Sequence, residues 1–368
     1  MTTTSENSSS GKITRYTESD YDELPKGKGK GLVNMSNTCY MNSALQSFAH
    51  TRPMINWFIK NEYKEDLNKN KPESYLVQSW KLLINNYISN DSSAPLQPAA
   101  FHAIINLLAS NRGLHLYQLG NQNDIHEFIQ FFVDSLHEAL CYPIKANIKG
   151  TVKSSLDKLT LSGHKQWATF YREQYSSMVD LFGCQLISTI TCPDCNTRSP
   201  SFTPEYCLTL SIPSKKKGKG PVDLTDCFKK FVEPEVMDAD NMYTCEKCKE
   251  KKRATKQIAV WRSPKILIIL LKRFRSHGQH AAKINDMVTY PFHLDMSPFC
   301  SSYDSINKSQ YSLYSVCNHQ GATGGGHYFA YCKDGDGKWR QYNDSTVSDI
   351  SEDKVVSQSA YCLFYERL

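Results

Sequence analysis

Two Cys-x-x-Cys pairs constrain this chain more than any other feature of its sequence. Cys192 and Cys195 form one pair, and Cys245 and Cys248 form the other. Four thiolates in two such knuckles suit the tetrahedral coordination of zinc, so we expect one structural zinc ion with every position filled by protein. The 49 residues between the pairs exceed the roughly 15 to 20 of a simple ribbon, which predicts knuckles on separate hairpins. The alternative is four reduced, unliganded cysteines, and the paired spacing favours the metal.

The length, the cysteine count and the apolar runs of the chain limit the classes of protein to which it can belong. The chain has 368 residues and 13 cysteines, and its N-terminus lacks a basic stretch followed by an apolar one. These features predict an intracellular protein with reduced, liganded or catalytic cysteines rather than a disulfide framework. The longest strongly apolar run, Ile266 to Leu271, is far shorter than the roughly 18 residues that a membrane span needs. We therefore expect no membrane partner.

A nucleic-acid partner is a weaker hypothesis. The 43 Lys and Arg residues exceed the 37 Asp and Glu residues by a net charge of +6, which is too small a surplus to demand one. The alternative function that stays open is a zinc-ribbon module that binds DNA or RNA through Lys215–Lys219 and Lys247–Lys256. Steep salt dependence of binding would favour it.

The sequence pattern predicts mainly helices in the first part of the chain and mainly strands after it. Residues 1–30 are rich in Ser, Thr, Lys and Gly and predict a disordered tail. Apolar residues at spacings of three and four predict a helix from Ile125 to Leu140, capped by Asn123 or Asp124. A second helix is expected near 100–110, and the mixed composition of 142–165 predicts a connecting loop or irregular insertion.

After Leu181, short β-branched and aromatic runs predict strands. The continuous apolar run from Ile266 to Leu271 is typical of a strand buried on both faces. The Lys215 to Gly220 segment predicts a solvated loop. Further strands are expected at Gln185–Thr191, Tyr311–Cys317, Tyr328–Lys333, Trp339–Tyr342 and Tyr361–Tyr365.

Cys39 is a candidate nucleophile. Tyr40, Ala44, Leu45 and Phe48 recur at helical spacing behind it, so Cys39 is expected at a helix N-terminus after a polar turn. There the helix dipole and free N–H groups favour thiolate over thiol. The alternative is a small buried hydrophobic residue, which is the commoner role of a single cysteine.

His327 is a candidate base. It follows three glycines, and Asn343 and Asp344 come 16 and 17 residues later, which fits a hairpin that presents all three at one end. In a Cys–His–Asn/Asp system the imidazole takes the thiol proton while the amide or carboxylate fixes the ring. The alternative is a histidine satisfied by a backbone carbonyl and an Asn-Asp turn between strands.

Five motifs in one order carry a family resemblance. They are Gly31 to Ser43, Asp124 to Phe128, the two Cys-x-x-Cys pairs, Leu270 to Phe274, and Gly326 to Tyr331. From about Gly31 to Arg367 the chain resembles the ubiquitin-specific protease family of cysteine deubiquitinases. The resemblance implies hydrolysis of the bond after the C-terminal glycine of ubiquitin, with ubiquitin and ubiquitylated proteins as partners. A catalytically dead ubiquitin binder is the third possibility.

The resemblance also implies roles for individual residues. Cys39 is the nucleophile, His327 the base and later the acid, and Asn343 the third member, with Asp344 assisting. Asn34 matches the oxyanion donor. The expected contacts with the ubiquitin tail fall on Asp124 and Glu127. His319 and Tyr328 match positions beside the narrow cleft for the terminal Gly-Gly, and the alternative for both is simple packing. Carboxylates suit the arginines of that tail, although Glu127 is equally typical of an ordinary acid in a first helical turn.

The implied fold is α+β and papain-like, with the architecture of a right hand. A helical thumb (31–181) bears Cys39, β fingers (182–262) hold the zinc, and a β palm (263–368) bears His327 and Asn343. Two residues depart from the family pattern. Ser36 stands where Gly is usual, which predicts strain if the turn needs a positive φ, and Asn123 replaces a common Gln.

Overall fold

The computed structural model describes residues 2–5, 28–89, 93–214, 220–277, 280–301, 309–322 and 325–368. Most of the predicted tail and the loop at Lys215–Lys219 lie outside these ranges. The described ends of the tail are built into the protein. Thr2–Ser5 forms strand β1, which pairs with β2 (Ala146–Lys149), and the carbonyl oxygen of Lys30 accepts a hydrogen bond from Gln46 of the first helix.

Helices dominate the first half of the described chain, as the sequence predicts. They are α1 (Cys39–Ala49), α2 (Arg52–Ile59), α3 (Tyr63–Asp66), α4 (Ser74–Ile88), α5 (Ala99–Asn111), α6 (Ile125–Leu140), α7 (Ser155–Tyr171) and α8 (Ser177–Phe182), with α9 (Leu224–Val232) later. Two 3₁₀ turns follow at Ser297–Phe299 and Glu352–Lys354. None of the helices in the described ranges is long and apolar enough to cross a membrane.

Helix α6 confirms the predicted amphipathic helix and its cap. The Asp124 carboxylate accepts a hydrogen bond of 2.7 Å from the backbone N–H of His126, which satisfies one of the free donors of the first turn. The apolar face of the helix is buried in the same core as α1. The cap therefore fixes the start of α6 beside the helix that begins at Cys39.

The loop predicted for 142–165 is wrong over most of its second half. Ser154 and Asp157 form a reciprocal capping box that starts α7, and this signal was present in the sequence. The helix packs against β10 through Gly163, where an added Cβ would lie 2.5 Å from Nε1 of Trp261. Trp167 and Tyr171 form a small separate core beneath the helix. The polar composition of the segment hid this narrow apolar face.

Strands fill the second half. They are β3 (Cys184–Thr191), β4 (Arg198–Glu205), β5 (Leu208–Ser211), β6 (Val222–Asp223), β7 (Glu235–Val236), β8 (Tyr243–Thr244), β9 (Lys251–Lys252), β10 (Thr255–Arg262), β11 (Ile266–Lys272), β12 (Phe274–His277), β13 (His280–Lys283), β14 (Val288–Thr289), β15 (His293–Asp295), β16 (Gln310–Ala322), β17 (Gly325–Lys333), β18 (Trp339–Asn343), β19 (Thr346–Asp349) and β20 (Ala360–Arg367). The main sheet has the order β19-β18-β17-β16-β20-β11-β5, with β15 paired to β16. A second sheet has the order β4-β3-β10-β7.

Strand β11 confirms the prediction of burial on both faces. Ile266, Ile268 and Leu270 contribute to the core shared with helices α1 and α6. Leu267, Ile269 and Leu271 contribute to a second core, which includes α9. Successive side chains of a strand point to opposite faces, so a continuous apolar run is what a sheet covered on both sides requires.

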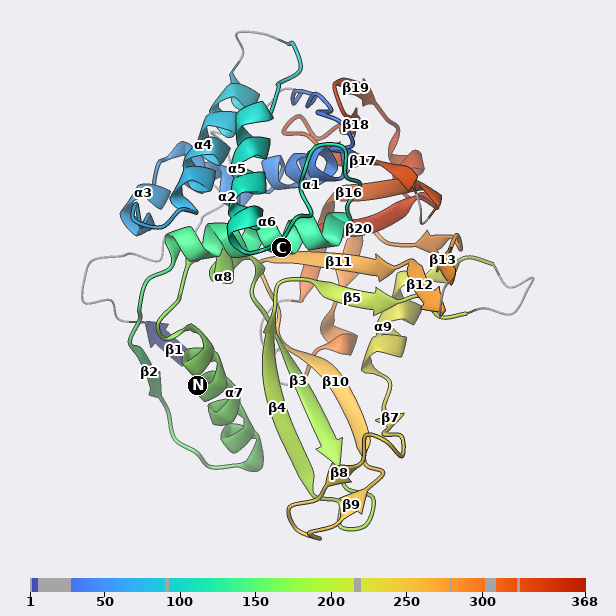
Figure 1. Cartoon of the computed structure of the whole chain (residues 1–368). Helices are drawn as coiled ribbons and strands as arrows, with labels where there is room; N and C mark the ends of the chain where they lie inside the picture. The colour runs from blue at the N-terminus through green and yellow to red at the C-terminus, as the bar shows by residue number, and fades with distance from the viewer. Residues whose placement is uncertain are drawn as a thin grey trace.

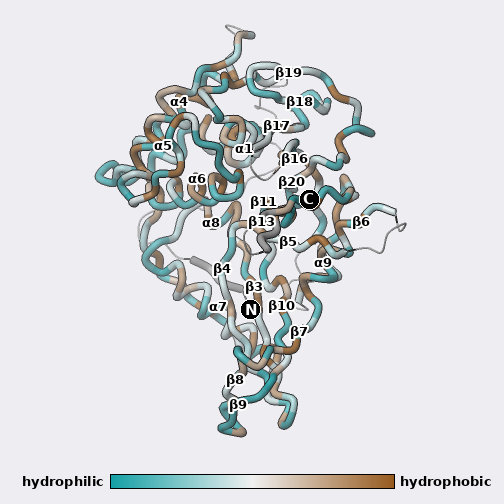
Figure 2. Tube along the Cα trace, turned by 45° about the vertical axis from the view of Figure 1, so that its right-hand side comes forward, coloured by the Kyte–Doolittle hydropathy of each residue, from teal (hydrophilic) through white to brown (hydrophobic). Residues whose placement is uncertain are grey.

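Figure 1 shows how the helices, the main sheet and the second sheet are arranged. Helices α1 to α6 gather at one side of the main sheet, and β3, β4 and β10 extend away from it toward a tip formed by β8 and β9. That tip is mostly hydrophilic in Figure 2. Helix α1 packs directly on β17 and β16, so the helix that begins at Cys39 meets the strand that carries His327.

Candidate active site

Cys39 begins helix α1, as the sequence predicts, and its side chain is 6% exposed. Burial raises the pKa of the Cys39 thiol, and the negative charge of Asp344 raises it further. The backbone N–H groups of Tyr328 and Tyr40 oppose this rise by hydrogen bonding to the sulfur. The net effect is a raised pKa, which favours the thiol over the thiolate. The predicted effect of the backbone N–H groups is therefore present, but burial opposes it and is the larger effect.

The turn before Cys39 contains the strain that Ser36 predicts. Ser36 has φ +82° and Asn37 has φ +57°. A left-handed conformation suits glycine and is unfavourable for serine. Asn37 donates a hydrogen bond of 2.7 Å to the carbonyl oxygen of Gly120, which helps to hold this turn against the segment before α6.

His327 lies on β17 and Asn343 ends the neighbouring strand β18. The two strands pair antiparallel, and Nε2 of His327 lies 2.6 Å from Oδ1 of Asn343. An amide oxygen only accepts hydrogen bonds, so in the neutral ring Nε2 carries the proton and Nδ1 is the free acceptor. Tyr328, one residue further along β17, lines the same cavity as Cys39. The hairpin thus brings a histidine–asparagine pair to the start of α1.

Asp344 joins the hairpin to the segment that precedes α1. Its two carboxylate oxygens accept hydrogen bonds from Nδ2 of Asn34 at 3.0 Å and from Nδ2 of Asn42 at 2.8 Å. Its backbone oxygen accepts from the N–H of Leu32 at 2.9 Å. Oδ1 of Asn34 accepts from the backbone N–H of Thr38 at 3.1 Å. These bonds fix the side chain of Asn34, and its Nδ2 group has a second N–H.

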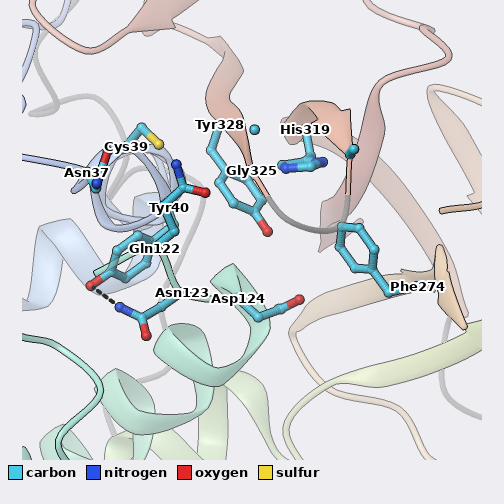
Figure 3. Close-up of a pocket in the computed structure, with 12 residues that line it drawn as sticks. Asn37, Cys39, Tyr40, Gln122, Asn123, Asp124, Phe274, His319, Gly325 and Tyr328 are labelled. Atoms are coloured by element: carbon cyan, nitrogen blue, oxygen red, sulfur yellow. Dashed lines mark hydrogen bonds between the residues drawn. The ribbon is translucent and has the colours of Figure 1, made fainter. Parts of the chain in front are cut away.

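A cavity of about 310 Å³ opens beside Cys39. It is lined by Asn37, Cys39, Tyr40, Gln122, Asn123, Asp124, Phe274, His319, Ala322, Gly325, Gly326 and Tyr328. In Figure 3, Tyr328 lies between Cys39 and His319, with Asp124 below it. The cavity is therefore bounded by the start of α1, the residues before α6, and strands β12, β16 and β17.

The structure separates the two acids that the sequence grouped as tail contacts. Asp124 lines the cavity, and its Oδ2 accepts a hydrogen bond of 2.6 Å from the hydroxyl of Tyr361. Glu127 is exposed in the first turn of α6 and is absent from the cavity lining within the described ranges. This position agrees with the ordinary first-turn acid that was its alternative.

Sequence reasoning missed several polar neighbours of these residues. Asn42 is buried on α1 among Tyr40, Met41 and Ala44, and a buried amide in an apolar helix face was the signal that it binds something. Gln122 lines the cavity two residues before the recognised motif that begins at Asp124, and the apolar Phe274, which ends the Leu270 to Phe274 motif, lines it as well. Asn123 is bonded to the Tyr40 hydroxyl at 3.1 Å, so the shorter amide still braces the wall of the cavity.

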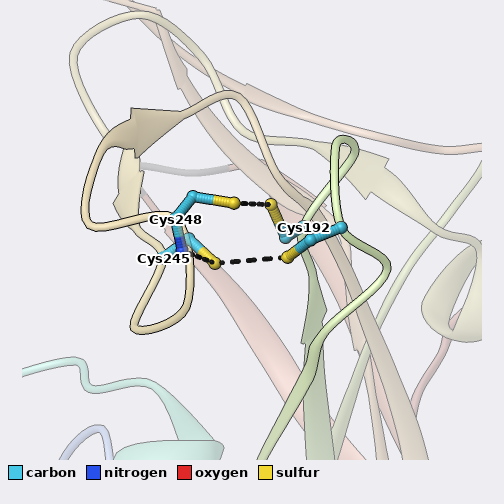
Figure 4. A group of neighbouring side chains, drawn as sticks. Cys192, Cys245 and Cys248 are labelled. Atoms are coloured by element: carbon cyan, nitrogen blue, oxygen red, sulfur yellow. Dashed lines mark hydrogen bonds between the residues drawn. The ribbon is translucent and has the colours of Figure 1, made fainter.

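The four predicted metal ligands converge near the tip of the second sheet (Figure 4). The sulfur atoms of Cys192, Cys195, Cys245 and Cys248 all lie within 4.8 Å of one another. Sulfur atoms are 4.0 Å apart for Cys192 and Cys248, and 3.6 Å apart for Cys195 and Cys245. A tetrahedron with bonds of about 2.3 Å from zinc to sulfur has edges of about 3.8 Å. The cluster therefore fits a tetrahedral metal ion, and all thirteen cysteines are free of disulfides.

The two knuckles have the same backbone geometry. The residue after each pair, Asn196 or Lys249, has a positive φ of 55° or 60°. Its N–H donates to the carbonyl oxygen of the first cysteine, Cys192 or Cys245, at 3.1 or 2.8 Å. This repeated turn directs both sulfur atoms of a pair to one side, so the metal site rests on two independent hairpin ends.

The fold and the geometry of the site together indicate a class of enzyme. An α+β fold that sets a cysteine at a helix N-terminus against a strand with a histidine–asparagine pair is the arrangement of papain-like thiol hydrolases. The profile of the family described as "Ubiquitin carboxyl-terminal hydrolase" matches residues 30–365. The chain belongs to the ubiquitin carboxyl-terminal hydrolase family.

Curated relatives and solved structures agree with this assignment. Ubiquitin carboxyl-terminal hydrolase 2 of Homo sapiens is 35% identical over 341 residues, which cover 91% of this chain and 54% of the relative. Ubiquitin carboxyl-terminal hydrolase 21 of Homo sapiens is 32% identical over 354 residues, which cover 91% of this chain and 61% of the relative. The chain thus spans little more than half the length of these two proteins.

A solved structure shares the fold. It is described as the SAGA Ubp8/Sgf11/Sus1/Sgf73 DUB module bound to ubiquitin aldehyde. The matching chain is 27% identical with a TM-score of 0.71, and the match covers 94% of this chain and 71% of that chain. The predicted α+β fold of this family, with a four-cysteine cluster in its β region, is confirmed.

Proposed function

We propose that this chain is a deubiquitinase that hydrolyses the isopeptide or peptide bond after the C-terminal glycine of ubiquitin. The observation that carries the proposal is the packing of the Cys39 helix on β17. Tyr328 of that strand lines the cavity together with Cys39, and the preceding residue, His327, is bonded to Asn343. The family match and the ubiquitin aldehyde bound to the similar solved structure support ubiquitin as the substrate.

The chemistry begins from a neutral thiol. His327 Nδ1 accepts the proton of the Cys39 thiol while the sulfur attacks the carbonyl carbon of the terminal glycine. Asn343 holds the ring through Nε2 and stabilises the imidazolium that forms. Since burial raises the pKa of Cys39, proton transfer coupled to attack suits this site better than a standing thiolate.

The charge on the carbonyl oxygen needs donors that are already in place. Asn34 has one N–H bonded to Asp344 and a second N–H for the oxyanion, and the N–H groups at the start of α1 add to it. Asp344 acts as a positioning residue because it holds Asn34 and Asn42 together. The imidazolium of His327 then protonates the leaving amine, and water hydrolyses the thioester on Cys39.

The cavity suits a narrow, extended tail. Tyr328 and His319 line it, and Asp124 supplies a carboxylate near one end. A diglycine terminus has no side chains, so it fits where larger residues would collide with these walls. Glu127 lies outside the lining, and we assign it a contact with the tail only beyond the cavity, where its exposed carboxylate can pair with an arginine.

We further propose that the four-cysteine cluster binds one structural zinc ion. All four ligand positions are then filled by protein, so the metal stabilises the hairpin ends and takes no part in the hydrolysis. Metal content by elemental analysis, with a melting curve before and after chelation, tests this. An unchanged melting temperature after the metal has been stripped would contradict a structural role.

We propose that this chain has the three regions of the right-hand architecture that the family resemblance implies. We assign the thumb to 31–181, the fingers to 182–262 and the palm to 263–368, with the cavity between thumb and palm. Thirteen free cysteines also support an intracellular location.

Covalent trapping tests the activity directly. The wild type and Cys39→Ala are incubated with ubiquitin that carries a C-terminal electrophile, and the intact mass is measured. We expect an adduct of one ubiquitin on the wild type alone, while Cys39→Ala still binds ubiquitin. A folded, metal-loaded wild type that forms no adduct would refute the proposal, and a parallel probe built on a related modifier shows whether the modifier is the error.

A further inference from the structure

Lys283 is a half-buried lysine that has no role in the proposed chemistry. It ends β13, a short strand outside the main sheet that pairs with β12. Its Nζ lies 2.8 Å from Nδ1 of His319, 2.8 Å from the carbonyl oxygen of His319 and 3.1 Å from the carbonyl oxygen of Gly321. An ammonium group has three N–H donors and no acceptor. All three donors of Lys283 are thus directed at the end of β16.

This contact determines which nitrogen of His319 carries the proton. Since Lys283 only donates, Nδ1 of His319 must present its lone pair, and the proton of the neutral ring lies on Nε2. Burial lowers the pKa of His319 to about 4, and the positive charges of Lys283 and His327 act in the same direction. The ring is therefore neutral at physiological pH, and its tautomer is fixed by a residue on another strand.

The other side of the ring faces the cavity. The His319 ring centroid lies 4.5 Å from that of Tyr328, and Figure 3 shows the His319 side chain directed toward Tyr328. Nε2 lies over Gly326, where an added Cβ would come within 2.2 Å of it. Gly326 also lines the cavity. Among the described residues, no hydrogen-bond partner of His319 Nε2 is found, so its N–H is left for a ligand.

We propose that Lys283 is a positioning residue that keeps His319 in the Nε2–H tautomer, so that His319 donates a hydrogen bond to a backbone carbonyl of the diglycine tail. The inference rests on the proposed function for the identity of the ligand. A tail without side chains can be recognised only through its backbone groups, and a buried backbone carbonyl needs a donor. The opposite tautomer would point an N–H at an ammonium and offer the tail a lone pair.

The tautomer is measurable without substrate. The imidazole ¹⁵N chemical shifts of the free protein distinguish a protonated nitrogen from an unprotonated one, and His319→Phe identifies the His319 signals. We expect the Nε2–H pattern in the wild type and in Lys283→Arg, whose side chain also only donates. In Lys283→Met, which keeps the length of the stem, we expect a mixture of tautomers and a raised pKa. An Nδ1–H pattern in the wild type, or an unchanged pattern in Lys283→Met, would overturn the proposal.

Kinetics separates positioning from simple bracing of β16. We expect Lys283→Met and His319→Phe each to lower kcat/KM for a C-terminal amide of ubiquitin by about tenfold, the effect of one hydrogen bond of about 1.4 kcal/mol. If Lys283 acts through His319, the double variant loses no more than His319→Phe alone. Additive losses in a folded double variant would show that Lys283 acts separately and would refute the mechanism.

A matched control is available on the surface. Lys354 is exposed in the 3₁₀ turn before β20, so Lys354→Met removes the same charge away from the cavity and should leave kcat/KM unchanged. The two proposals fail in different ways. A wild type without ubiquitin adduct contradicts the proposed function, whereas the ¹⁵N shifts of the free protein decide the role of Lys283 in either case.

Discussion

Asp334 connects the end of the Cys39 helix to the strands of His327 and Asn343, and Asp334→Asn tests that connection. Asp334 is 2% exposed. Its carboxylate accepts hydrogen bonds from Nε2 of His50 and from the Tyr342 hydroxyl, both at 2.6 Å, and from Nη1 of Arg340. His50 immediately follows α1, and Arg340 and Tyr342 lie on β18. One carboxylate thus ties α1 to the sheet behind the active site.

His50 is positively charged in this network. Its Nδ1 lies 2.7 Å from the carbonyl oxygen of Gln46, and its Nε2 faces the Asp334 carboxylate. Both partners are acceptors, so both ring nitrogens carry protons. Burial opposes this charge, but the Cys332 sulfur and the Asp334 carboxylate outweigh burial and hold the pKa of His50 well above its usual range.

The expected loss follows from the two charged hydrogen bonds. Each hydrogen bond to a charged group contributes about 1.5 to 3 kcal/mol, and breaking a buried ion pair costs about 3 to 5 kcal/mol. We therefore expect Asp334→Asn to lower the free energy of unfolding by about 3 to 5 kcal/mol, measured by urea denaturation followed by tryptophan fluorescence and circular dichroism. The rate of adduct formation with the ubiquitin probe should fall as well, because α1 and β17 lose a shared anchor.

Asp336→Asn is the matched control. Asp336 pairs with the same guanidinium at 2.6 Å, but its side chain is 27% exposed. We expect a loss of about 1 kcal/mol or less, as for exposed pairs. A loss below about 1 kcal/mol in Asp334→Asn, or equal losses in the two variants, would refute the argument that burial makes this carboxylate important.

The Asp334 network also predicts how the free energy of unfolding changes with pH. The raised pKa of His50 contributes stability that is complete below its unfolded value of about 6.5 and is lost as pH rises through the folded value. The lowered pKa of Asp334, where His50, Tyr342 and Arg340 together outweigh burial, contributes stability that is lost as pH falls through the folded value. The difference between wild type and Asp334→Asn should thus be largest near pH 6, at about the unfolded pKa of His50, and shrink at alkaline pH. A difference that continues to grow as the pH rises above about 6 would contradict the charged state of His50.

Three further substitutions test the site. Ser36→Gly should raise the free energy of unfolding by about 0.5 to 1 kcal/mol, because relief of a left-handed serine exceeds the added unfolded-state entropy; a lower urea midpoint would contradict this. Asn343→Ala should lower kcat by about 10- to 100-fold, because His327 loses the partner that fixes its ring; single-turnover rates with a ubiquitin amide measure it. Tyr361→Phe removes a donor to Asp124 and should raise KM by about tenfold with little change in kcat; a fall in kcat alone would contradict a binding role for that carboxylate.

Local patterns predicted much of the fold. The apolar spacing and the acid at its start predicted α6 and its Asp124 cap, because both depend on neighbours within one turn. The run from Ile266 to Leu271 predicted a doubly covered strand for the same reason. The capping box at Ser154 could have predicted α7, but its sparse apolar face becomes visible only when β10 packs against it.

The sequence predicted the reacting groups of the site but not the residues that hold them in position. Cys39, His327 and Asn343 stand in recognisable local motifs, and the spacing of the four cysteines indicates their metal site. Asn42 and Lys283 have no such motif, since each acts on a residue that is distant in the chain. Long-range hydrogen bonds of this kind depend on register between strands and on helix docking, which no local pattern encodes.

The sequence by itself determined the elements, the family and the chemical types at the site, because periodicity, capping and ligand spacing are properties of neighbouring residues. Only the tertiary structure decided the protonation states. Burial against the sheet raises the pKa of Cys39, Lys283 fixes the tautomer of His319, and Asp334 keeps His50 charged. A pKa reflects solvent exclusion and charges brought together from distant segments, and these exist only once the chain has folded.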